Sequence, residues 1–153
     1  MPLPNLDRLL AQDHFPGMTF AETRITREWI RAHAGEWDVI HFNYRLGEGI
    51  SLSQESDSEL RRMFQLLTQK RADVVVESGN RVAVLEIKVR VSPPVIGQLL
   101  VYRDLWIERD PGRRVPRLIA VGRTLVPDTR PTLTAAGIEV ELFPQTPEPQ
   151  TAI

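Results

Sequence analysis

A hairpin that carries charges inside two apolar strands constrains this sequence more than any other feature. Residues 71–77 and 81–89 are rich in valine, and the Ser-Gly-Asn between them is typical of a tight turn. Asp73 lies in the first predicted strand, and Glu86 and Lys88 lie in the second. Because strand side chains alternate between faces, Glu86 and Lys88 point to the same side, and the hairpin can bring Asp73 next to them.

Charges inside a sheet are costly unless they are paired or bind a metal. One interpretation is a structural ion pair, in which Lys88 neutralises Glu86 and Asp73 is an edge-strand charge. The other is a functional site, in which two carboxylates and an ammonium group share one patch of an otherwise apolar sheet. The hairpin alone favours neither interpretation, so the decision depends on the segment that follows it.

Residues 95–108 follow with the pattern of a helix, with Ser92 as a candidate cap and two prolines in the first turn. Gln98 and Tyr102 are four residues apart, so they lie on one face of this helix. That face is also apolar, which places Gln98 against the sheet. A buried glutamine needs hydrogen-bond partners, and the charged patch would supply them. The apolar positions are Val95, Leu99, Tyr102, Leu105 and Trp106.

Asp73, the Glu86-Ile87-Lys88 triplet and the Gln98-x-x-x-Tyr102 helix together resemble the PD-(D/E)XK nuclease superfamily, and more narrowly its RecB-like members with a QxxxY motif. The tight match covers about a quarter of the chain. Ala72 stands where the proline that names the superfamily would be, and that proline is often missing. The resemblance implies an α/β fold with a restriction-endonuclease-like αβββαβ core, a mixed sheet flanked by helices.

The resemblance also implies a metal-dependent nuclease that hydrolyses phosphodiester bonds of nucleic acid, with DNA favoured over RNA. Asp73, Glu86 and the main-chain carbonyl of Ile87 would bind Mg²⁺ or Mn²⁺, which prefer oxygen ligands. Lys88 would orient or deprotonate the attacking water and help to neutralise the transition state. The supporting residues in the catalytic site would be Gln98 and Tyr102.

Glu22 has two possible roles in the predicted helix of residues 19–33. Thr19 and Glu22 have the spacing of a capping box, in which each satisfies a main-chain N–H of the other. Glu22 also falls on the apolar stripe of that helix, which would turn it toward the site. In nucleases of this type a glutamate of the first helix often joins the metal ligands, so both roles stay open.

The other elements follow the same periodicity rules. We expect strands at 36–46, 117–122 and 138–143, the last at an edge, and helices within 51–70 and at 128–136. Ser56 or Asp57 can cap the first of these helices, and Gly137 can close the second. We expect a single nuclease-like domain over residues 1–143 and a disordered, proline-rich tail over residues 144–153.

The net charge of −1 gives no general attraction to nucleic acid, so binding would depend on a local set of basic side chains. The expected partner is DNA, with RNA and a homodimer as further possibilities. Two rivals remain, a non-catalytic nucleic-acid- or protein-binding module on a nuclease fold and a structural domain with an internal ion pair. The candidate contacts to nucleic acid are Arg61, Arg62, Arg71, Arg113 and Arg114.

Several classes of protein are excluded by what the sequence lacks. Without cysteine there are no disulfides, no cysteine-based catalysis and no cysteine-ligated iron–sulfur cluster, which some RecB-like nucleases carry. No apolar run approaches the ~20 residues of a membrane-spanning helix, and the N-terminus lacks the features of a signal peptide. We therefore expect a cytoplasmic protein with no membrane partner.

Overall fold

The computed structural model describes residue 3, residues 5–49 and residues 57–145. A five-stranded sheet forms its centre, with the strands in the order β1-β2-β3-β5-β7. β1, β2 and β3 pair antiparallel, whereas β3, β5 and β7 pair parallel, so the sheet is mixed as predicted. The strands are β1 (Val39–Arg45), β2 (Arg71–Ser78), β3 (Arg81–Ile87), β5 (Arg117–Gly122) and β7 (Ile138–Leu142).

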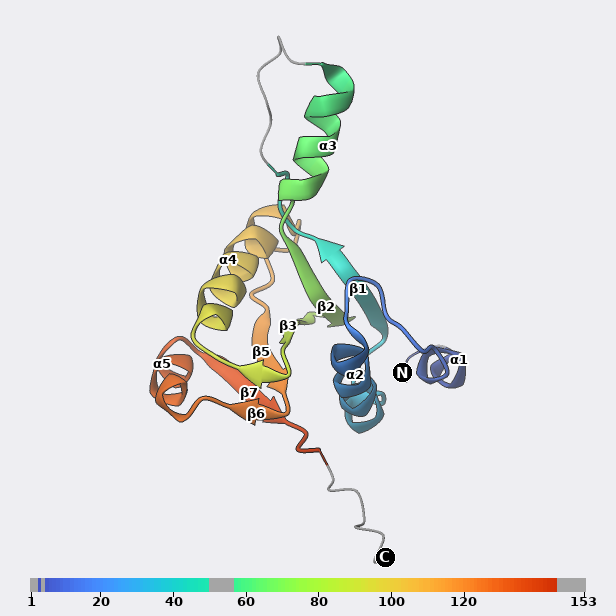
Figure 1. Cartoon of the computed structure of the whole chain (residues 1–153), viewed down its shortest axis with the longest axis vertical. Helices are drawn as coiled ribbons and strands as arrows, with labels where there is room; N and C mark the ends of the chain where they lie inside the picture. Colours follow the sequence, from blue (N-terminus) through green and yellow to red (C-terminus); the bar gives the residue numbers. More distant parts are fainter. Residues whose placement is uncertain (1–2, 4, 50–56, 146–153) are drawn as a thin grey trace, which may run out of the picture.

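Helices cover both faces of this sheet, which confirms the predicted fold class. α1 (Leu6–Leu10) and α2 (Phe20–His33) lie on one side, and α4 (Pro94–Arg109) and α5 (Arg130–Ala135) lie on the other (Figure 1). A short 3₁₀ helix, η1 (Pro127–Thr129), leads into α5. The two parallel connections, β3–α4–β5 and β5–α5–β7, place both crossover helices on the same face of the sheet.

The valine-rich hairpin divides the core into two halves. Val74 and Val76 pack toward α2, together with the aromatic side chain of Trp29. Val75 and Val84 pack toward α4 and its Leu99. All four valines are fully buried, and burying a side chain of this size contributes ~1.5–3 kcal/mol. The period-two alternation of the sequence therefore gives both strands two apolar faces, and β3 becomes the central strand of the sheet.

The two helices nearest the charged residues begin differently. The capping box of α2 is confirmed: the Glu22 N–H donates to Thr19 Oγ1 and the Thr19 N–H donates to Glu22 Oε1, both at 3.2 Å. The prediction that Ser92 caps α4 is wrong, because Pro93 occupies the N-cap position and no side chain caps this end. The prolines suit the first turn, and Ser92 contributes only its main-chain carbonyl, to the N–H of Val95 at 3.1 Å.

The connections add two features, of which the sequence predicted one. α3 (Ser58–Thr68) extends away from the body of the protein beyond the ends of β1 and β2 (Figure 1), and Asp57 caps it by accepting from the Glu59 N–H at 2.8 Å. Ser56, the other cap candidate, lies outside the described residues. A second sheet of two short strands, β4 (Arg90–Val91) and β6 (Thr124–Leu125), was not predicted.

The C-terminal elements agree with the sequence. β7 is an edge strand, and Gly137 follows α5 with a φ of 72°, a left-handed conformation that suits glycine. Most of the predicted tail, residues 146–153, lies outside the described residues. Within the described part of the chain, no helix combines the length and the apolar character needed to cross a bilayer.

The close packing of β5 against the chain after β3 leads to a prediction about Gly122. A Cβ atom at this position would lie 2.4 Å from the main-chain oxygen of Lys88 and 2.9 Å from Val91 Cγ2. We expect Gly122→Ala to lower the free energy of unfolding by ~1–3 kcal/mol or more in urea titrations, since backbone cannot yield as a side chain does. Gly97→Ala in α4 is the control, because a Cβ there meets no atom within 4 Å and alanine favours a helix by up to ~1 kcal/mol. Equal stability of the two variants would contradict this packing.

Candidate active site

Asp73 and Glu86 lie side by side at the end of the hairpin farthest from its turn. β2 and β3 pair through Val74 and Leu85, and continuing that register by one residue places Asp73 opposite Glu86. Both carboxylates therefore belong to the face of the sheet that α4 covers. Glu86 is 4% exposed, which is unusual for a glutamate and places its charge inside the protein.

The strand ladders are interrupted at Asp73. β1 pairs with β2 on either side of this residue, through Phe42 with Val74 and Tyr44 with Ala72. Between them Asn43 has a φ of 49°, a left-handed conformation that is strained for most residues and better tolerated by asparagine. On the other side, Asp73 Oδ2 accepts a hydrogen bond from the Ile87 N–H at 2.8 Å. The carboxylate thus replaces a main-chain partner and is fixed in position.

Lys88 reaches the carboxylate pair from the solvent side. Its Nζ lies 3.6 Å from Glu86 Oε1, while its side chain is 40% exposed. Its main-chain N–H donates to the Val121 carbonyl at 2.9 Å, so the backbone stays aligned with β5 after β3 has ended. An ammonium group that is close to a buried acid and still accessible can meet a bound substrate.

α4 carries two polar side chains, Gln98 and Tyr102, whose surroundings bear on the predicted site. Glu86 Oε2 and Gln98 Oε1 are both buried, and neither has a hydrogen-bond partner in the structure. Burial and the negative charges of Glu86 and Asp73 raise the pKa of Tyr102 above its usual value. The phenol therefore stays protonated and can donate a hydrogen bond. Unsatisfied acceptors of this kind mark a position where a cation or a donor fits.

The electrostatics of the pair favour protonation in the absence of a cation. Burial, followed by the negative charge of Asp73, raises the pKa of Glu86 to about 8, and the charge of Lys88 opposes this rise. Burial also raises the pKa of Asp73, although the hydrogen bond from Ile87 opposes it, and the charge of Glu22 adds to the rise. Two like charges in a poorly solvated place cannot both ionise easily. A divalent cation would remove this penalty.

The two carboxylates therefore fit a hard divalent cation, which needs more ligands than these two side chains supply. The carboxylates of Asp73 and Glu86, the latter with its unpartnered Oε2, provide oxygen donors of the kind that Mg²⁺ and Mn²⁺ prefer. Within the described part of the chain, no three His, Cys, Asp or Glu side chains converge on one ion position. Glu22 influences Asp73 electrostatically while its own Oε1 caps α2. The roles of Glu22 and of the Ile87 carbonyl as ligands stay predictions.

The predicted nucleic-acid contacts occupy different environments. Arg71 starts β2, two residues before Asp73, and donates to the Asn43 carbonyl at 3.3 Å. Arg113 is exposed in the turn after α4, where its φ is 49°. Arg61 and Arg62 lie on the protruding α3. The structure does not bring these four arginines together around the carboxylates, and their contacts with nucleic acid stay predictions.

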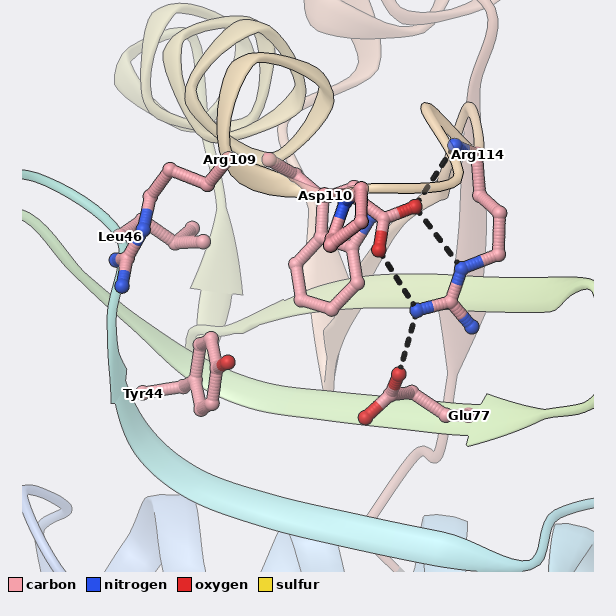
Figure 2. A pocket seen from close by; sticks show the side chains of 8 residues that line it. Tyr44, Leu46, Glu77, Arg109, Asp110 and Arg114 are labelled. Atoms are coloured by element: carbon pink, nitrogen blue, oxygen red, sulfur yellow. Dashed lines mark hydrogen bonds and ion pairs between the residues drawn. The ribbon is translucent and has the colours of Figure 1, made fainter.

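Arg114, the fifth predicted contact, is held in an ion-pair network. Its guanidinium donates to Glu77 Oε1 at 2.8 Å and to both carboxylate oxygens of Asp110 at 3.0 Å (Figure 2). Glu77 Oε2 also forms a hydrogen bond with His41 Nε2 at 2.7 Å. Two carboxylates already balance the charge of Arg114, which weighs against a phosphate contact there. The sequence did not indicate this network, although Glu77 has the same strand parity as Asp73.

Comparisons with known proteins support the fold. Among solved structures, the chain is similar to a repair endonuclease from Pyrococcus abyssi, with a TM-score of 0.53 and 18% identity over 88% of this chain and 50% of that chain. A structure of an EndoMS–dsDNA2 complex overlaps more loosely, with a TM-score of 0.48, 13% identity and coverage of 90% and 51%. The chain thus spans about half the length of either. No protein-family model and no curated protein sequence matches. At such identity, the first likeness shows a shared fold alone.

The raised pKa of Glu86 predicts how stability changes with pH. In the unfolded chain Glu86 has its ordinary pKa of 4.5 and loses its proton near that pH. In the folded protein without metal, Glu86 keeps its proton until the pH approaches about 8. The free energy of unfolding therefore falls between about pH 5 and about pH 8, with a limiting slope of ~1.4 kcal/mol per pH unit for one proton. We expect Glu86→Gln to lose less stability over this range in urea titrations with EDTA. Glu108→Gln, on the exposed side of α4, should behave as wild type. Parallel curves for all three proteins would contradict the assignment.

Proposed function

We propose that this protein is a metal-dependent nuclease that hydrolyses phosphodiester bonds, with DNA as its substrate. The observation that carries the proposal is the pair of the half-buried Asp73 and the buried Glu86 beside the accessible ammonium group of Lys88. A sheet that only needed stability would gain from apolar residues at these positions. Perturbed, partly compensated carboxylates of this kind are typical of catalytic sites.

In this mechanism Asp73 and Glu86 would hold Mg²⁺ or Mn²⁺, with the Ile87 carbonyl as a further ligand. The cation would lower the pKa of the attacking water and stabilise negative charge on the phosphate. Lys88, as an ammonium group, orients the attacking water and neutralises the developing charge; to accept the proton of that water it would first have to lose its own. Tyr102, kept protonated by its neighbours, donates a hydrogen bond to the carboxylates or to a phosphate oxygen, and Gln98 holds the same group in place.

The choice of DNA over RNA follows the fold neighbour, a repair endonuclease. This chain aligns with half of that neighbour, so the other half can carry part of the neighbour's specificity. A homodimer is a second way to enlarge the binding surface, and it stays a prediction.

A non-catalytic nucleic-acid-binding module is the second candidate. The observation that favours it is the pair, rather than a trio, of acidic side chains at one ion position among the described residues. A module of this kind would bind DNA without cutting it, with or without a divalent cation. Cleavage and metal-binding measurements separate the two candidates.

Replacing Lys88 tests the catalytic role directly. We expect purified protein to cut DNA in Mg²⁺ or Mn²⁺ but not in EDTA, and Lys88→Ala to reduce the rate by ~10²–10⁴-fold, the usual contribution of a positioned acid or base. The matched control is Lys70→Ala, because Lys70 is the only other lysine and is exposed. It should retain the rate within a few-fold. Equal losses in both variants, or cutting that persists in EDTA, would count against the proposal.

Metal binding can be tested without any substrate. A cation that binds the folded state stabilises it by mass action, by ~2.7 kcal/mol at one hundred times the dissociation constant. We expect Mn²⁺ to raise the melting temperature of the wild type and to have little effect on Asp73→Asn. Glu139→Gln, which removes a carboxylate at the distant edge strand β7, should respond as wild type does. A shift of equal size in all three proteins would indicate binding elsewhere.

A further inference from the structure

A pocket lies on the same face of the sheet as the carboxylate pair, at the other end of α4. It has a volume of about 180 Å³, and a cavity of ~150 Å³ suffices for a benzene ring. Its walls come from the end of β1, from β2 and from the end of α4 with the following turn (Figure 2). The residues that line it are Tyr44, Leu46, Glu77, Trp106, Arg109, Asp110, Pro111 and Arg114.

Helix and strand geometry place this pocket close to the candidate active site. Trp106 follows Tyr102 by four residues on the buried face of α4, a distance of ~6 Å along the helix. Glu77 follows Asp73 by four residues on β2, a distance of ~13 Å. A nucleic-acid strand covers such a span in about two to four nucleotides at ~3.4 Å each. One strand can therefore reach both places.

Two aromatic side chains contribute to the wall of the pocket. Trp106 is 5% exposed, and its Nε1 is buried. Tyr44 is half-buried, and its ring centroid lies 5.9 Å from that of Trp106. Because the Trp106 N–H has almost no accessible surface, the ring of Tyr44 is the aromatic group that a ligand in the pocket can meet.

Most charged groups of the pocket already form ion pairs with one another. Arg114 joins Glu77 to Asp110 and lies over the Trp106 ring, 5.5 Å from its centroid. Arg109, at the exposed rim, donates to the Arg45 carbonyl at 2.6 Å. The walls are therefore close to neutral, and among the residues that line the pocket the cation without a carboxylate partner, Arg109, lies at the rim. A planar, uncharged group with a phosphate outside it matches this arrangement better than a buried anion does.

From these features we infer that the pocket binds one unstacked nucleobase of the nucleic-acid strand that occupies the active site. Tyr44 provides the stacking surface, and Arg109 at the exposed rim lies where the phosphate of the same nucleotide would be. Stacking of this kind is how proteins hold single-stranded nucleic acid and bases that have left a duplex. The substrate class is then nucleic acid with an unpaired nucleotide near the cleaved bond, a refinement that rests on the proposed nuclease function.

The test compares two fluorescein-labelled oligonucleotides of equal length, one of thymidine and one in which every site is abasic. Binding to the full chain is measured by fluorescence anisotropy in EDTA, so that no cutting occurs. For the wild type we expect the thymidine oligomer to bind at least tenfold more tightly than the abasic one. Tyr44→Leu should weaken the thymidine oligomer about tenfold and leave the abasic one unchanged.

Phe20→Leu is the matched control, because it makes the same kind of change at an exposed aromatic ring that does not line the pocket. It should bind both oligomers as the wild type does. The inference is overturned if Tyr44→Leu weakens both oligomers equally, or if it leaves the difference between them unchanged. Since no metal or cleavage enters this measurement, its outcome is independent of whether Lys88→Ala abolishes metal-dependent cutting.

Discussion

The repulsion between Asp73 and Glu86 is the constraint on which the rest of the site depends. The β2–β3 register sets the two carboxylates opposite each other, and the hydrogen bond from the Ile87 N–H holds Asp73 in place. The surrounding apolar core keeps water away, so the charges are neither separated nor well solvated. Lys88 compensates them only in part, at 3.6 Å from Glu86. A fold that keeps such a pair gives up stability at this position, and a bound cation would restore it.

A single helix links the carboxylate pair to the neighbouring pocket. Gln98, Tyr102 and Trp106 follow one another at intervals of four residues, which places them in a row along the face of α4 that meets the sheet. Tyr102 is close enough to the carboxylates for their charge to raise its pKa, and Trp106 lines the pocket. Because these side chains share one rigid element, the distance between the proposed site of cleavage and the proposed base site is set by the helix itself.

Much of this arrangement could be predicted from sequence, because its signals are local. The alternation of valines defined the hairpin, the four-residue spacing of Gln98 and Tyr102 defined a helix face, and Thr19 with Glu22 defined a cap. The cap of α4 was placed at Ser92, one residue too early, since proline dihedrals suit both the N-cap and the first turn. The network of Arg114 depends on a contact with Glu77, 37 residues away in the sequence. No local sequence pattern predicts such a contact. For the same reason, the pocket beside Trp106 could not be anticipated.

The most direct test of the account is a calorimetric titration with Mn²⁺ at about pH 7, repeated in two buffers with different ionisation enthalpies. Burial and the charge of Asp73 raise the pKa of Glu86 to about 8, so most Glu86 carboxyls are protonated before metal binds. A cation held by both carboxylates must displace that proton. The account predicts one binding site, release of nearly one proton per metal ion, and loss of both in Glu86→Gln. Binding without proton release, or binding that Glu86→Gln leaves unchanged, would contradict it.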